Sequence, residues 1–391
     1  CPGVEVAADR RMTDSKSDSR IWGDSKKGAK QWQEDSFGFL ISKNQKVNIL
    51  SVFDGHGGYN GLVASNTARD TLKSYFAPKI EECESWNVPT WTKNLQDLFK
   101  IIHDKIREQF LSQNGQGIRK SPNGRVKDQN GIVRNSSGDP IHGGTTASIC
   151  VSLQESDGTY TVIGANTGDS TAVLISEDTS FEFLSEDHGP DNEQEFKRLQ
   201  SLDDKAYPKK LIFVYDKAKC YKKFECPRVF LPDGKKDPKY VQNPWGHGLH
   251  PTNVRYEPAV YAVTPQSVSR DATCIAMTRA LGDFYAGQFG LSSTPSILVK
   301  RTQKGVRFMM GVASDGVWDC WKYENFSKYI CALWKEKKLS VKDMVETALT
   351  ESVTRAITNF GSGHYVSEFV FRCTVLQLIP CSCFCFANQD D

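Results

Sequence analysis

Short runs of apolar and β-branched residues, separated by polar turns, recur along this chain and predict β-strands. The run from Val47 to Phe53 is mostly apolar, which is typical of a strand buried on both faces. The same kind of run predicts further strands at residues 37–41, 145–153, 160–165, 171–175, 308–314 and 366–378. The strands outnumber the helices and come in pairs, so antiparallel sheets with helices packed outside are favoured over a doubly wound parallel sheet.

The remaining predicted elements are helices. A helix is expected from about residue 59 to 76, and apolar residues between Leu95 and Phe110 mark a second, amphipathic helix. A short helix is expected at residues 193–199. Ser340, followed three residues later by Asp343 and then an apolar run, has the pattern of a helix N-terminus.

Segments without periodicity divide the chain. Residues 1–20 are polar and rich in Ser and Asp, which predicts a flexible extension before one globular domain at residues 21–379. Within that domain, residues 112–142 are expected to form a long loop, and residues 202–272 an insertion or lid. Residues 380–391 form a Cys-rich tail. The tail has neither the paired spacing of a zinc site nor a prenylation box, so a disordered tail is favoured over a metal-binding or lipidated one.

Composition narrows the classes of partner and compartment. The 391 residues carry 49 basic and 47 acidic side chains, a net charge of +2, so bulk charge gives no reason to expect a nucleic acid or an anionic membrane as partner. No apolar run is long enough to span a bilayer. The 12 cysteines, mostly scattered, favour free thiols in an intracellular compartment, cytoplasm or nucleus. Because the sequence begins at Cys1 and not at Met, a removed leader and secretion stay compatible with it.

Acidic residues recur at the ends of the predicted strands. Asp54 and Asp315 each follow a buried strand and precede glycine, Glu34 and Asp35 precede a strand, and Asp169 lies in a turn between two strands. A turn or cap role explains each of these residues singly. Their repetition at strand ends favours a shared site for Mg²⁺ or Mn²⁺, which prefer carboxylate, carbonyl and water oxygens.

Such a site suits hydrolysis of a phosphate ester. Two divalent ions about 3.5–4 Å apart can clamp a phosphate and activate a water for direct attack, without a covalent intermediate. His56 lies two residues after Asp54 in a glycine-rich loop, where it could donate a proton to the leaving oxygen. A lone histidine is more often structural, but its position beside a predicted metal ligand favours a catalytic role.

Seven segments in order resemble the motifs of the PP2C (PPM) family of metal-dependent serine/threonine protein phosphatases. They are Gln33–Asp35, Val52–Gly58, Gly144–Ala147, Ala165–Ser170, Asp187–Pro190, Thr278–Asp283 and Ala313–Asp319. Together they span nearly the whole chain, and seven motifs in the family's order are far more specific than any single one.

The resemblance implies a set of metal ligands. Asp54 is expected to bridge two Mn²⁺ or Mg²⁺ ions, the carbonyl of Gly55 to bind one of them and Asp315 the other. Glu34 and Asp35 are expected to hold waters bound to these ions.

The resemblance also implies a third metal site, a general acid, a fold and a class of substrate. Asp169 and Asp319 could hold a third, weaker ion, and His56 is the expected general acid. The implied fold is α+β: an α/β/β/α sandwich of two antiparallel sheets flanked by helices on both faces. The implied substrate is a protein carrying phosphoserine or phosphothreonine, and the implied oligomeric state is a monomer. The segment 202–272 corresponds to an enlarged flap beside the active site.

Two departures leave a second hypothesis open. Lys30 stands where the family has a phosphate-binding arginine, and lysine lacks the two-pronged guanidinium. His364 and Tyr365 stand where the family has an Asp–Asn pair, so a neutral imidazole replaces a carboxylate ligand. The alternative to an active phosphatase is therefore a degenerate pseudophosphatase that binds phosphoproteins or regulates a partner. Five of the six expected inner carboxylates remain, which favours an active enzyme of reduced activity: Asp35, Asp54, Asp169, Asp315 and Asp319.

Overall fold

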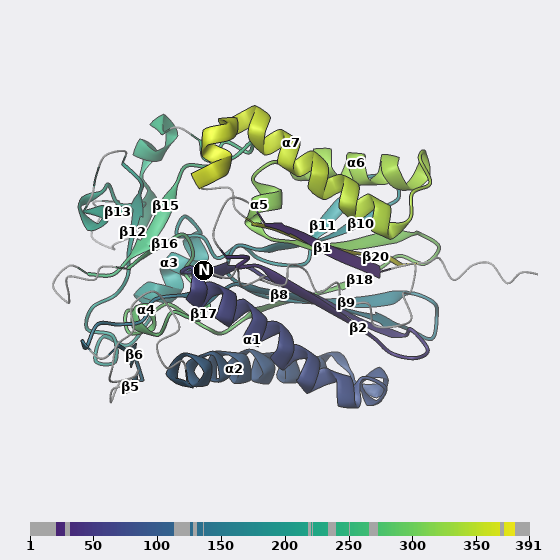
Figure 1. Ribbon diagram of the computed structural model, residues 1–391, viewed down its shortest axis with the longest axis horizontal. Helices are drawn as coiled ribbons and strands as arrows, with labels where there is room; N and C mark the ends of the chain where they lie inside the picture. The colour runs from purple at the N-terminus through teal and green to yellow at the C-terminus, as the bar shows by residue number, and fades with distance from the viewer. Residues whose placement is uncertain are drawn as a thin grey trace, which may run out of the picture.

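Two five-stranded antiparallel sheets lie face to face at the centre of the molecule (Figure 1). The first has the order β1 (Ile21–Lys27), β20 (Phe371–Ile379), β19 (Phe308–Ala313), β10 (Thr171–Ser176) and β11 (Phe181–Phe183). The second has the order β18 (Ser296–Arg301), β9 (Tyr160–Thr167), β8 (Ala147–Gln154), β3 (Val47–Phe53) and β2 (Ser36–Ile41).

The computed structural model describes most of the chain. The described residues are 21–27, 32–112, 126–127, 131–135, 137–217, 220, 222–233, 240–249, 251–265, 273–367 and 371–379. The predicted extension at 1–20 and the tail at 380–391 lie outside them, as does Lys30.

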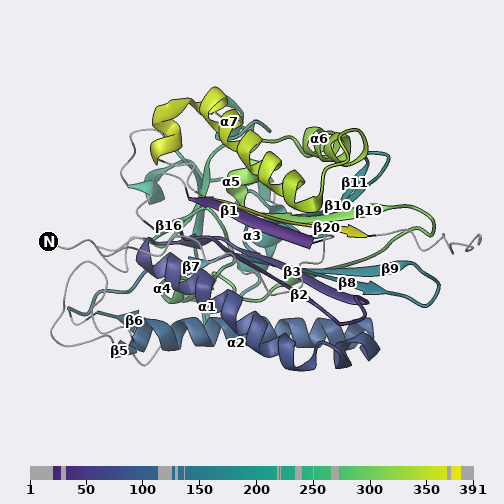
Figure 2. The same ribbon diagram turned by 45° about the vertical axis from the view of Figure 1, so that its right-hand side comes forward.

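Helices cover the outer face of each sheet. In Figures 1 and 2, α1 (Tyr59–Phe76) and α2 (Val88–Ser112) lie against the second sheet, while α6 (Tyr323–Lys335) and α7 (Val341–Ser367) lie against the first. This four-layer arrangement confirms the predicted sandwich. Three short helices complete the set in the described residues: α3 (Glu193–Gln200), α4 (Phe284–Gly287) and α5 (Asp315–Trp318).

Strand β3 shows how the layers are held together. All seven of its residues are buried, and alternate side chains point to opposite faces. Val47, Ile49 and Phe53 belong to the apolar core shared with α1 and α2. Leu50 and Val52 belong to the core between the two sheets. A strand with both faces covered needs a continuous apolar run, which is the pattern that the sequence has here.

The helices bury one face each. In α2, the buried residues recur three or four positions apart: Trp91, Leu95, Leu98, Phe99, Ile102, Ile106 and Phe110. The intervening positions carry charged side chains, including the exposed pair Lys93 and Asp97. Burial of such apolar side chains stabilises the fold by about 1.5–3 kcal/mol each.

The predicted insertion at 202–272 has its own secondary structure. Strands β12 (Ile212–Tyr215) and β15 (Val260–Val263) form a small sheet with β16 (Cys274–Ile275), which follows the insertion. Strand β13 (Phe230–Pro232) pairs with β14 (Tyr240–Gln242). A separate apolar cluster that includes Phe213 and Phe230 lies beneath them. Within the predicted loop at 112–142, the described residues form one short pair, β5 (Val126–Lys127) and β6 (Val133–Arg134).

The end of the domain differs from the prediction. A strand was expected from residue 366, but α7 continues to Ser367 and β20 begins at Phe371. His364 and Tyr365 therefore belong to the last turns of α7, and their side chains lie outside the described residues. The apolar run at 366–378 could not reveal this boundary because short apolar runs do not distinguish helix from strand.

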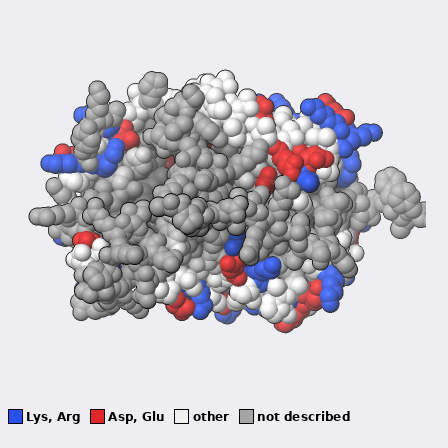
Figure 3. Space-filling model, viewed as in Figure 1, with Lys and Arg blue, Asp and Glu red and all other residues white. Residues whose placement is uncertain are grey.

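Two surface properties bear on partners. None of the helices in the described part of the chain is long and apolar enough to cross a membrane. On the face shown in Figure 3, Lys and Arg side chains lie beside Asp and Glu side chains around the edge of the described surface.

Candidate active site

The predicted acidic residues converge at one end of the two sheets. Asp54 follows β3 of the second sheet, Asp315 follows β19 of the first, and Asp169 lies in the turn between β9 and β10. Since β10 pairs with β19 in the register Thr171↔Ala313, the last two carboxylates belong to neighbouring strand ends. The structure thus brings together side chains that are far apart in the sequence.

Thr146 links the two sheets at this point. Its hydroxyl accepts a hydrogen bond from the backbone N–H of Asp54 at 3.0 Å, and its own N–H donates to the Asp54 carbonyl at 2.8 Å. The same hydroxyl lies 2.7 Å from that of Ser170, the neighbour of Asp169. The two hydrogen bonds of this buried hydroxyl help to fix the backbone beside two of the predicted ligands.

Burial and mutual repulsion act strongly on these carboxylates. Burial, followed by the charges of Asp35, Asp315 and Asp169, raises the pKa of Asp54 well above its ordinary range. Burial and the charge of Asp315 raise the pKa of Asp169 to about 7. Negative charges this close disfavour one another unless a cation lies between them.

Glu34 and Asp35 lie beside this group. Both are almost fully buried, and Ser314 donates a hydrogen bond to Oδ2 of Asp35 at 3.0 Å. A side chain at Gly55 would overlap the carbonyl oxygens of Glu34 and Gly61, so only glycine admits this close approach of three segments.

His56 is held by a residue to which the sequence motifs assigned no role. Its Nε2 lies 2.6 Å from Oδ2 of Asp283, whose side chain is 2% exposed. Burial alone would lower the pKa of His56, but the charge and hydrogen bond of Asp283 outweigh it and raise that pKa. The second ring nitrogen, Nδ1, has no hydrogen-bond partner among the described residues.

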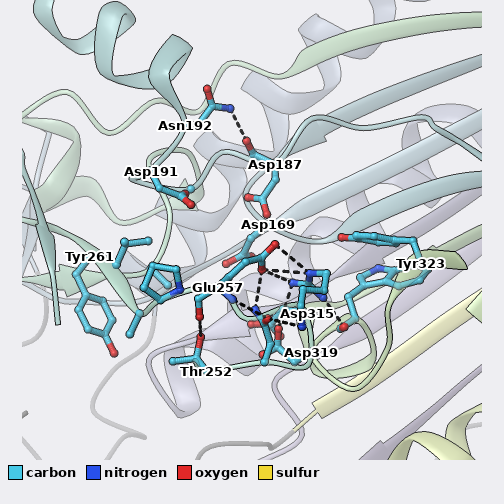
Figure 4. Close-up of a pocket in the computed structure, with 18 residues that line it drawn as sticks. Asp169, Asp187, Asp191, Asn192, Thr252, Glu257, Tyr261, Asp315, Asp319 and Tyr323 are labelled. Carbon is cyan, nitrogen blue, oxygen red and sulfur yellow. Dashed lines mark hydrogen bonds and ion pairs between the residues drawn. The ribbon is translucent and has the colours of Figure 1, made fainter. Parts of the chain in front are cut away.

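A pocket of about 720 Å³ opens beside the strand ends, and Figure 4 shows its lining. Asp169, Asp315 and Asp319 lie at one side of it, and Arg255 and Glu257 of the insertion line it as well. The insertion therefore forms part of the pocket wall.

Arg255 brings a positive charge into this acidic pocket. Its guanidinium contacts Glu257 at 2.7 Å and Asp319 at 3.5 Å, and it donates to the carbonyl of Trp318. It also lies over the ring of Tyr323, 5.3 Å from its centroid. The sequence analysis did not identify Arg255, which lies in a segment without periodicity, and it placed Asp283 in a motif without assigning it a role. Only the fold brings both residues to the site.

The donors fit a divalent cation in chemical type. Carboxylate oxygens dominate the cluster, and Oδ1 of Asp169 is buried without a hydrogen-bond partner in the described part of the chain. In the present arrangement, no three His, Cys, Asp or Glu side chains of the described residues surround one position closely enough to hold a metal ion. Of the predicted site residues, Glu34, Asp35, Asp54, Gly55, His56, Asp169, Asp315 and Asp319 lie in this region.

Known proteins resemble this chain along most of its length. The model of the family described as Protein phosphatase 2C matches residues 20–357. The chain is 27% identical over 310 residues, 77% of its length, to "Probable protein phosphatase 2C 73" of Oryza sativa subsp. japonica. It is 29% identical over 175 residues, 44% of its length, to "Probable protein phosphatase 2C 4" of Paramecium tetraurelia. These matches span 60% and 48% of the two relatives.

A solved structure shares the fold. It is a serine-threonine phosphatase 2C from Toxoplasma gondii, with a TM-score of 0.54 and 16% sequence identity. The superposition covers 92% of this chain and 94% of that one. At this identity the likeness bears on the fold alone.

Proposed function

The chain belongs to the protein phosphatase 2C family, and we propose that it is a metal-dependent phosphatase acting on phosphoserine and phosphothreonine in proteins. The observation that carries the proposal is the cluster of Asp54, Asp169 and Asp315 at the ends of strands from both sheets. So much buried negative charge at one point is costly, and a bound cation would offset the cost.

The residues divide the work of hydrolysis among them. Asp54, Asp169 and Asp315 would hold Mn²⁺ or Mg²⁺, with Glu34 and Asp35 close by. When bound, the cation supplies Lewis-acid polarisation of a water and of the phosphate oxygens. Water attacks phosphorus directly, and the proposal needs no nucleophilic side chain.

His56 completes the reaction. Attack on phosphorus expels a serine or threonine oxygen, which is a strong base and leaves poorly without a proton. His56 is the proposed proton donor, because it lies two residues from Asp54 and its Nδ1 makes no hydrogen bond to any described residue.

The first test is phosphate release from a phosphothreonine peptide in Mn²⁺, in Mg²⁺ and in EDTA. We expect turnover with either metal and none in EDTA. Asp54→Asn should lower kcat at least about 100-fold, because it removes several kcal/mol of electrostatic stabilisation. The matched control is Asp97→Asn, which changes an exposed aspartate on α2 and should leave kcat unchanged. Equal turnover in EDTA, or an Asp54→Asn variant as active as the wild type, would contradict the proposal.

His364→Asp is a second arm of this assay. Placing the family's carboxylate at this position should increase turnover at low Mn²⁺. The position lies in α7, so circular dichroism must show that the helix content is retained.

A binding module without turnover is the second candidate function. The contact between Arg255 and Asp319 favours it, since a cation of the protein already neutralises one predicted ligand. The sequence departures at Lys30 and His364 point the same way. Calorimetry with a phosphothreonine peptide and its unphosphorylated form would distinguish the two: selective binding without phosphate release under any metal supports the module.

A further inference from the structure

Three two-residue strands bring His56 and Asp283 together across 227 positions of sequence. β4 (Gly55–His56) pairs with β7 (Gly144–Thr145), and β7 pairs with β17 (Leu281–Gly282). In this register both His56 and Gly282 lie opposite Gly144. Asp283, directly after β17, is thereby placed next to the imidazole.

Gly144 leaves room for the pair to form. A Cβ atom at this position would overlap Oδ2 of Asp283 and would come within 2.5 Å of the Leu281 carbonyl oxygen. Only glycine at this position of β7 therefore leaves space for the Asp283 carboxylate to reach His56.

The backbone of Asp283 is held in a conformation that non-glycine residues seldom adopt. Its φ is 44° and its ψ 43°, in the left-handed region. Its N–H donates to the Gly143 carbonyl at 3.0 Å, and its own carbonyl accepts from Gly287 at 3.0 Å at the start of α4. Strained backbone that the surroundings fix so firmly is concentrated at functional sites.

The contact also assigns the two ring nitrogens. Nε2 of His56 is engaged by a carboxylate that is nearly inaccessible to water. Nδ1 is buried and makes no hydrogen bond to any described residue. A carboxylate that accepts a hydrogen bond from one nitrogen of an imidazole fixes the ring's orientation and determines which nitrogen is available for proton transfer.

We propose that Asp283 is a positioning residue: it holds Nε2 of His56, so that Nδ1 is the nitrogen that donates the proton to the leaving oxygen. In this step a P–O bond forms to the attacking water and the P–O bond to the serine or threonine oxygen breaks. The Nδ1 proton moves to that oxygen. The water releases a proton to solvent, and the imidazole takes one back. The inference rests on the proposed phosphatase function.

The test compares two leaving groups. Asp283→Asn keeps the size of the side chain, and asparagine tolerates the left-handed backbone, but the neutral amide is a weaker acceptor. We expect kcat on a phosphothreonine peptide to fall about 100-fold with KM unchanged. On p-nitrophenyl phosphate, whose leaving group needs little protonation, the fall should be less than about threefold. The control is Asp97→Asn, an exposed residue of α2, which should leave kcat on both substrates unchanged.

If Asp283 had a purely structural role, Asp283→Asn would lower the activity on both substrates by the same factor. Equal losses on the two substrates, or no loss on either, would overturn the proposal. A readout without turnover comes from NMR of ¹⁵N-labelled histidine rings, with His56 identified by the signals missing in His56→Gln. We expect Asp283→Asn to change the Nε2 signal. A wild type that hydrolyses neither substrate contradicts the phosphatase function. The spectrum then tests the contact between His56 and Asp283 by itself: a His56 signal that is unchanged in Asp283→Asn overturns that contact.

Discussion

A buried carboxylate needs a nearby cation or hydrogen-bond donor, and the acidic residues of this protein meet that need in different ways. Glu195 has Arg198 and Arg279 beside it. Asp319 has Arg255 at 3.5 Å. Asp54, by contrast, lies among other carboxylates, and burial with their charges raises its pKa. A bound cation therefore gives the largest electrostatic stabilisation beside Asp54, which is where we propose that the metal ions bind.

Arg255 should weaken metal binding at Asp319, because its guanidinium already forms an ion pair with the carboxylate that a third metal ion would use. Arg255→Gln is expected to tighten Mn²⁺ binding roughly fivefold, the size of a partly exposed ion pair. Calorimetric Mn²⁺ titration of the purified protein measures this without reference to turnover. Arg228→Gln, an exposed arginine of the same insertion, is the control. Unchanged or weaker binding in Arg255→Gln would show that the guanidinium does not compete.

Single residues differ in how far the sequence reveals them. Asp54 and Asp315 could be predicted, because each ends an apolar run that had to be a buried strand, and each precedes glycine. Asp283 could not be assigned its role, since that depends on the register of three two-residue strands. Arg255 could not be found either, because the insertion has no periodicity from which its position could be inferred.

At the scale of elements, α7 shows that a local signal marked the start of the helix but not its end. Ser340 lies just before α7, where its hydroxyl accepts from the Asp343 N–H at 3.2 Å and donates to the Asp343 carboxylate at 2.7 Å. The sequence shows this pattern directly. The C-terminal end of α7 carries no comparable signal, so the prediction placed a strand there.

Ser340→Ala should lower the free energy of unfolding by about 1 kcal/mol, since it leaves the Asp343 N–H, in the first turn of α7, without its side-chain acceptor. Urea unfolding followed by far-ultraviolet circular dichroism measures the change. Ser74→Ala, on the exposed face of α1, makes the same substitution away from a helix start. A Ser340→Ala variant as stable as wild type would mean that the cap contributes nothing to the fold.

For the whole molecule, the layered architecture was predictable and the insertion was not. The apolar runs predicted antiparallel sheets with helices packed outside, and the family resemblance implied that two such sheets stack face to face. The insertion instead shares an apolar cluster with residues on either side of it, such as Leu199 and Tyr285, and contributes a wall of the pocket. Its contacts with the pocket join segments that are distant in sequence, and no local pattern specifies such contacts.

Glu195 is one such long-range connection, and it makes the stability of the molecule depend on pH. From α3 it binds Arg279, 84 residues away, at 2.5 Å, together with Arg198 of its own helix. Burial opposes its ionisation, but the hydrogen bond and charge of Arg279 and the charge of Arg198 outweigh burial and lower its pKa to about 2 from about 4.5. The ionised form is thus favoured by folding, and its contribution is complete above pH 4.5.

That contribution should be lost as the pH falls from about 4.5 toward 2, because the unfolded chain then binds a proton that the folded protein does not. The full difference amounts to about 3 kcal/mol. Glu195→Gln removes the titrating group, so in urea unfolding the stability gap between wild type and variant should stay nearly constant above about pH 5 and should narrow as the pH falls below about 4.5. Glu193→Gln, an exposed glutamate on the same helix, should follow the wild-type curve. A gap that stays constant with pH would mean that Glu195 stabilises the fold by packing and not by its charge.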